Sequence, residues 1–131
     1  MINYFSKYKF IFYLCNFILI FLYLFPGSLL GCYLYDDCNL QPQITPDFII
    51  STNHLYAFIF LSTIGFLTFK KSSHFYILSV YLIIISLMLE IMHYFIPMRS
   101  FEFSDLFGNL VGVLIIIILS FFLKKYENFK N

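Results

Sequence analysis

The sequence predicts an all-α fold, specifically a four-helix transmembrane bundle with both termini in the cytoplasm. Three observations predict it: the composition, four long apolar runs, and the placement of the lysines. Of 131 residues, 61% are apolar and 11% are charged, whereas about 25% of a typical soluble domain is charged. A soluble fold of this length could not bury so much apolar surface, so residues 1–131 are predicted to form a single integral membrane domain.

The four apolar runs predict helices at about 10–34, 49–69, 75–97 and 105–123. A membrane-spanning helix needs about 20 predominantly apolar residues. The first run is longer than a signal-peptide core and no A-x-A cleavage site follows it, which favours a retained helix. Leu29-Leu30-Gly31-Cys32 also resembles a bacterial lipobox, so lipidation of Cys32 stays open.

The distribution of basic residues predicts the orientation. Arg99 is the only basic residue on one side of the four-helix arrangement. The lysines all fall on the other side: Lys7, Lys9, Lys70, Lys71, Lys124, Lys125 and Lys130. Cytoplasmic loops are enriched in Lys and Arg, so the lysine-rich side is expected inside and the acidic 36–53 loop outside. In an oxidising exterior Cys32 and Cys38 could pair, and two free thiols are the alternative.

Several function classes are disfavoured by the same sequence. The net charge of +1 provides no basic field for nucleic acid. The three cysteines form no CxxC or Cys/His cluster, so no metal and no cofactor is predicted. Glu90 and His93 make one Glu-x-x-His motif, whereas the di-metal helix bundles need two.

In the predicted topology the unusual polar residues gather at the outer end of the bundle. Ionisable groups are costly inside a membrane and usually face a protein interior or a wet cavity. We therefore predict an outward-facing polar pocket with six ligand-binding residues: His54, Glu90, His93, Arg99, Asp105 and Asn109. Glu90 and His54 are the candidates for catalytic residues, if the protein is an enzyme.

Each of these residues also has a structural interpretation. Glu90 could belong to a buried hydrogen-bond network, and His54 could be an interfacial hydrogen-bonding residue. Arg99 could anchor to lipid phosphate without specificity, or bind an anionic headgroup through a bidentate contact. Gly108 and Gly112 form a G-x-x-x-G motif that lets another helix approach closely. Such an approach would bring Asp105 and Asn109 toward the third helix, and helix–helix self-association through the same two glycines stays open.

These motifs resemble the VanZ-like family of small bacterial membrane proteins. The resemblance rests on one spaced set of residues over about residues 20–115: Ser51-Thr52-Asn53-His54, Glu90, Pro97-x-Arg99-Ser100-Phe101-x-x-Ser104-Asp105, and Asn109-x-x-Gly112. The family usually has Gln at the position of His93, and an Asp-Lys pair where this chain has Thr52-Asn53. The resemblance implies a multi-pass protein of the bacterial cytoplasmic (inner) membrane, in the cell envelope, and supplies no reaction.

The leading functional hypothesis is recognition of an anionic membrane lipid or a lipid-linked cell-wall precursor. Arg99 would hold the negative charge, and Glu90 with His54 would orient the headgroup. One alternative is a membrane-embedded enzyme that uses Glu90 or His54 as general base on an envelope substrate. A structural or transport subunit is the other alternative.

Overall fold

The computed structural model describes residues 4–69 and 72–130, and this part of the chain is helical, with five α-helices and no strand. The helices are α1 (Tyr4–Leu24), α2 (Leu29–Tyr35), α3 (Thr52–Thr68), α4 (Ser72–Met92) and α5 (Phe103–Lys130). The prediction of an all-α chain is therefore confirmed for these residues. Lys70 and Lys71, which contributed to the predicted orientation, lie outside the described residues.

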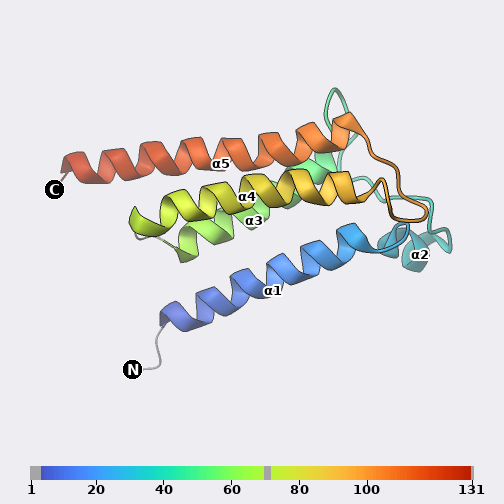
Figure 1. Cartoon of the computed structure of the whole chain (residues 1–131), viewed down its shortest axis with the longest axis horizontal. Helices are drawn as coiled ribbons and strands as arrows, with labels where there is room; N and C mark the ends of the chain where they lie inside the picture. Colours follow the sequence, from blue (N-terminus) through green and yellow to red (C-terminus); the bar gives the residue numbers. More distant parts are fainter. Residues whose placement is uncertain (1–3, 70–71, 131) are drawn as a thin grey trace.

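The four longer helices lie alongside one another (Figure 1). α5 packs against α3 and α4, and α1 packs against the same two helices. The start of α1 and the end of α5 lie at one end of the molecule, while α2 and the longer connections lie at the other. With 28 residues, α5 is the longest helix and extends past its neighbours, whereas α3 has only 17.

The predicted helix at 10–34 is wrong, because the chain turns between α1 and α2 by 75°. The turn contains Pro26 and Gly27; proline cannot donate a helical hydrogen bond, and Gly27 has φ +75°, which favours glycine. The Ser28 hydroxyl then caps α2 by accepting a hydrogen bond from the Gly31 amide at 3.0 Å. A disulfide between Cys32 and Cys38 ties α2 to the loop that follows it.

The third predicted helix also ends earlier than expected. α4 stops at Met92, and the predicted end at residue 97 is replaced by tight turns. The amides of His93, Tyr94 and Phe95 bond to carbonyls three residues back, instead of four. Pro97 disfavours helical geometry at Ile96, which accounts for the end of the helix before the proline.

The bounds of the other two helices differ from the prediction by smaller amounts. α3 covers Thr52–Thr68 instead of 49–69, and α5 begins at Phe103 and runs to Lys130, past the predicted end at residue 123.

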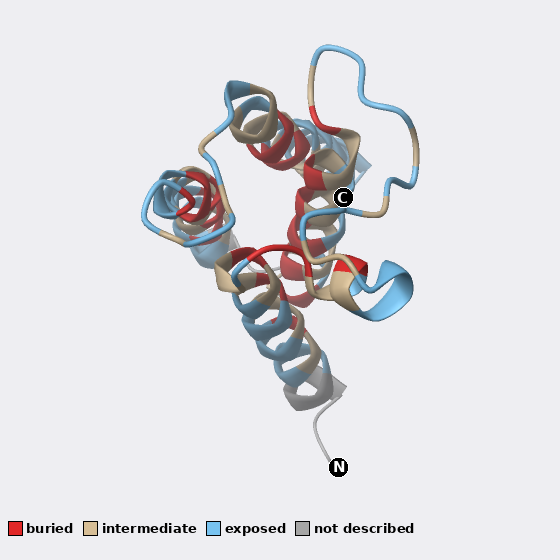
Figure 2. Ribbon diagram, turned by 90° about the vertical axis from the view of Figure 1, so that its right-hand side faces the viewer, coloured by how far each residue is buried: buried red, intermediate tan, exposed pale blue. Residues whose placement is uncertain are grey.

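Buried residues lie on the faces where the long helices meet (Figure 2). The core consists of Phe12, Leu19, Tyr23, Phe58, Leu61, Leu78, Leu82, Leu89 and Val113. Gly108 and Gly112 allow α5 to lie close to α3, because an added Cβ would lie 2.5 Å from the Ser51 oxygen and 2.7 Å from the Leu55 oxygen, respectively. The G-x-x-x-G face is thus packed on α3 within the same chain.

Among the described residues, α4 and α5 are each long and apolar enough to cross a membrane, and α1 with α2 is a third candidate if that bent pair forms one span. Large apolar side chains on their outer surfaces are exposed, including Ile84 and Met88 on α4 and Ile118 and Phe122 on α5. In water this would be an extensive apolar surface. The fold therefore indicates a membrane protein.

Candidate functional site

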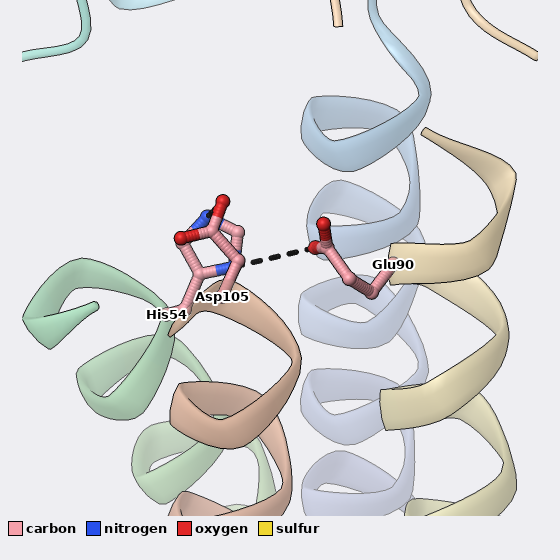
Figure 3. Close-up of side chains that lie close together, drawn as sticks. All are labelled: His54, Glu90 and Asp105. Atoms are coloured by element: carbon pink, nitrogen blue, oxygen red, sulfur yellow. Dashed lines mark ion pairs between the residues drawn. The ribbon is translucent and has the colours of Figure 1, made fainter. Parts of the chain in front are cut away.

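A cluster of polar side chains is buried where α1, α3, α4 and α5 meet, close to the end that carries α2. His54 lies in the first turn of α3, Glu90 in the last turn of α4, and Asp105 in the first turn of α5. Figure 3 shows His54 and Asp105 side by side, with Glu90 facing them from α4. His54 Nε2 is 3.4 Å from Asp105 Oδ2, and His54 Nδ1 is 3.9 Å from Glu90 Oε2.

A hydrogen-bond network that includes His54 joins four helices, α1, α3, α4 and α5. The Tyr23 hydroxyl donates to Asn109 Oδ1 at 2.7 Å, and Asn109 Nδ2 donates to the Ser86 carbonyl at 3.2 Å. His54 Nδ1 lies 3.1 Å from the same Asn109 oxygen. Because Asn109 Oδ1 can only accept, His54 Nδ1 is the protonated nitrogen in this arrangement. His54 Nε2 is therefore the nitrogen that faces Asp105.

Glu90 and His93 form a second pair in the cluster. His93 Nε2 is 2.9 Å from the Tyr23 carbonyl oxygen, which can only accept, so Nε2 carries a hydrogen. His93 Nδ1 is 3.1 Å from Glu90 Oε2, with 0% of the Glu90 side chain exposed. Either a proton shared by this pair or another cation must therefore balance the buried carboxylate. The second oxygen, Glu90 Oε1, accepts from the Glu102 amide at 3.0 Å.

Arg99 fixes the end of α1. Its Nη2 donates to the Leu22 carbonyl at 2.9 Å, and its Nε donates to the Phe25 carbonyl at 3.2 Å. These carbonyls lie at the C-terminal end of the helix, where a cation is favourable. Partial burial lowers the pKa of Arg99, which still leaves an arginine protonated at neutral pH.

A cavity of about 290 Å³ opens beside this cluster. His54 and Arg99 are part of its wall, together with Tyr23. The other polar lining residues are Ser28, Gln41, Gln43 and Asn53, and the apolar ones are Leu22, Leu29, Leu30, Pro42, Ile44 and Ala57. The cavity therefore joins one cationic side chain, several neutral hydrogen-bonding groups and an apolar surface.

The 36–51 loop is held against the start of α3, so it forms a defined side of this cavity. The Thr52 amide donates to Asp47 Oδ1 at 2.8 Å, and this hydrogen bond is the main cause that lowers the pKa of Asp47. The Asn53 side chain donates to the Pro42 carbonyl at 2.6 Å and accepts from the Ile44 amide at 3.0 Å.

The structure brings the six predicted site residues to the end of the molecule that carries α2, but divides them. His54 and Arg99 line the cavity, whereas Glu90, His93 and Asn109 are buried behind it and Asp105 is 19% exposed. The prediction missed Tyr23 and Ser86, both of which contact Asn109. Tyr23 is one of 11 tyrosines and lies in an apolar run, so nothing in the sequence distinguishes it.

No family model matches the chain, and no curated protein or solved structure matches it. The resemblance to the VanZ-like family therefore stays a prediction that rests on the spaced motif residues.

Proposed function

We propose that the chain is a VanZ-like integral membrane protein of the bacterial cell envelope, and that it binds an anionic lipid or lipid-linked envelope molecule. The observation that supports this proposal best is the cavity beside His54 and Arg99, with its mixed lining. A lipid with a charged headgroup requires both kinds of surface, because its headgroup needs hydrogen-bond donors and its chain needs apolar contact.

Arg99 is the group that would hold the negative charge. Its contacts with the Leu22 and Phe25 carbonyls use Nη2 and Nε, which leaves Nη1 without a hydrogen bond among the described residues. The same contacts hold the guanidinium in place, so little side-chain entropy is lost when a phosphate or carboxylate binds. Hydrogen bonds from a cation to an anion are roughly twice as strong as neutral ones.

The membrane arrangement that we propose has four spans, formed by α1, α3, α4 and α5, with both termini in the cytoplasm. Lys124, Lys125 and Lys130 lie in the last turns of α5, at the end opposite Arg99. The disulfide between Cys32 and Cys38 lies at the Arg99 end, and disulfides persist in oxidising compartments. Both features support an outward-facing cavity and placement in the cytoplasmic membrane.

Lipid binding can be tested with full-length protein in detergent, titrated with phosphatidylglycerol and, separately, with zwitterionic phosphatidylcholine. We expect tighter binding of phosphatidylglycerol, and about tenfold weaker binding by Arg99→Lys, because a lysine cannot reproduce the fork of the guanidinium. Ala57→Leu should also weaken binding, because it fills part of the cavity. Lys125→Ala is the control, because it removes an exposed cation from the other end of the molecule.

Two results would contradict the proposal. One is equal affinity for the two lipids, and the other is an unchanged affinity in both Arg99→Lys and Ala57→Leu. A circular dichroism spectrum for each variant would show that the helices are retained.

A further inference from the structure

We propose that His54, Glu90 and Asp105 form a binding site for a divalent transition-metal ion, with Zn²⁺ as the best match. One nitrogen of His54 and one oxygen from each carboxylate lie within 4.8 Å of one another. The three residues come from three different helices, so the fold itself creates the site. This inference goes beyond the proposed lipid binding and can be tested without lipid.

The geometry is close to that of a bound ion. Zinc bonds to His nitrogen and carboxylate oxygen are about 2.0–2.2 Å long, which places neighbouring ligand atoms of a tetrahedral site about 3.3–3.6 Å apart. His54 Nε2 and Asp105 Oδ2 are 3.4 Å apart. The ligand atom of Glu90 lies within 4.8 Å of the other two, so its side chain would have to move closer to complete the set.

Glu90 provides an independent observation that points to a ligand. Its side chain is 0% exposed, and Oε2 has no hydrogen-bond partner within the part of the chain that the structure describes. Oε1, by contrast, accepts from the Glu102 amide, which holds the carboxylate toward His54. A buried carboxylate oxygen without a hydrogen-bond donor is costly unless a cation binds it.

The surroundings of the two histidines also fit a metal site. Metal-binding histidines usually donate their second ring N–H to a carbonyl or carboxylate, which fixes the ring and leaves the other nitrogen free to bind. His54 Nδ1 is 3.1 Å from Asn109 Oδ1 and donates its hydrogen there, and the other ring nitrogen, Nε2, faces Asp105. His93 likewise donates its Nε2 hydrogen to the Tyr23 carbonyl, and its Nδ1 faces Glu90.

Charge and ligand type select the class of ion. In the described residues, histidines are the only basic side chains with a nitrogen within 4.0 Å of a Glu90 or Asp105 carboxylate oxygen. A divalent ion would balance these two negative charges. An imidazole ligand favours Zn²⁺ over Mg²⁺ or Ca²⁺, which prefer sites made of oxygen alone. His54 borders the cavity and Asp105 is 19% exposed, so an ion has a route from outside.

The test is Zn²⁺ binding by full-length protein in detergent after chelator treatment, followed by titration and elemental analysis. We expect one Zn²⁺ per chain. His54→Ala and Asp105→Asn should each lower the Zn²⁺ affinity by more than about 100-fold. Asn109→Leu should lower it by about 10–100-fold, because His54 Nδ1 loses its hydrogen-bond acceptor. The exposed His74 provides the control, since His74→Ala should leave binding unchanged.

Two results would overturn the site. One is folded wild-type protein that binds no Zn²⁺, and the other is an Asp105→Asn variant that binds Zn²⁺ as tightly as the wild type. Protonated histidines would then be the groups that balance the carboxylates. If His54→Ala does not fold, the partly exposed Asp105→Asn decides the question, together with the visible absorption of the Co²⁺-loaded wild type. A Co²⁺-loaded wild type whose visible spectrum lacks the intense bands of four-coordinate Co²⁺ with nitrogen and oxygen ligands would also overturn the proposed site.

Discussion

Tyr23 in α1 donates a buried hydrogen bond of 2.7 Å to Asn109 in α5, across 86 positions of sequence. The same hydroxyl lies 3.2 Å from His54 Nδ1, and the Tyr23 ring stacks on the His93 ring with an interplanar angle of 17°. One side chain from an apolar run thus contacts three members of the polar cluster. Tyr23 is therefore a structural centre of the site, although it carries no charge.

Replacing Tyr23 by Phe should destabilise the protein while keeping its apolar packing. The substitution removes one buried donor, and leaving polar groups unpaired in this way costs about 1–3 kcal/mol. Thermal unfolding in detergent would measure the loss. Tyr76→Phe is the matched control, because Tyr76 is 75% exposed. Equal unfolding temperatures for the two variants would contradict the buried network.

Gly112→Ala should be more harmful than Gly65→Ala. An added Cβ at Gly112 would lie 2.7 Å from the Leu55 backbone oxygen, so the α3–α5 contact would have to open. At Gly65 the nearest atoms, 3.0 and 3.3 Å away, belong to the side chains of Phe12 and Leu78, which can move. We expect Gly112→Ala to cost about 1–3 kcal/mol of unfolding free energy. Equal stability of the two variants would show that α3 and α5 are not in such close contact.

The disulfide predicts the reactivity of the three cysteines. In denatured protein without reductant, a maleimide reagent should label Cys15 alone, because Cys32 and Cys38 are bonded to each other. After reduction it should label all three. Mass spectrometry would count the labels, and Cys15→Ser should show none before reduction. Three labels before reduction would contradict the disulfide, and a lipid mass on Cys32 would support the lipobox alternative.

Acidification should loosen the start of α3 through Asp47. The Thr52 amide lowers the pKa of Asp47 below its ordinary value of 3.8. A carboxylate with a lowered folded-state pKa stabilises the fold above that ordinary value, and the contribution is lost as the pH falls through the folded-state pKa. The pH dependence of unfolding should therefore weaken in Asp47→Asn, with Asp36→Asn as control. An unchanged pH profile in Asp47→Asn would show that this contact does not stabilise the helix start.

The sequence predicted the helical class and that the candidate site residues lie near one end of the molecule, because both depend on local patterns. Apolar runs identify helices, and rare polar residues near their ends identify the site. It did not predict the bend at Gly27 or the early end of α4. Local residues mark both places, Pro26 with Gly27 and Pro97, but the residue at which each helix stops also depends on contacts distant in sequence, such as the contact between His93 and the Tyr23 carbonyl.

The division of the site was likewise beyond sequence patterns. Spacing placed Arg99 near the other polar residues, yet it could not show that the guanidinium would bond to the Leu22 and Phe25 carbonyls. Nor could it separate the residues that line the cavity from those buried behind it. These distinctions depend on the depth at which each helix packs, which the periodicity of a single run does not encode.

The unequal lengths of α3 and α5 have a consequence for the surrounding lipid. At about 1.5 Å per residue, the 17 residues of α3 measure about 25 Å and the 28 residues of α5 about 42 Å, whereas a bilayer has a hydrocarbon thickness of about 30 Å. In the four-span arrangement that we propose, lipid in contact with α3 would have to thin locally, while α5 would tilt or emerge into water. Since α3 carries His54 at its first turn, such thinning would lower the headgroup layer toward the opening next to that residue.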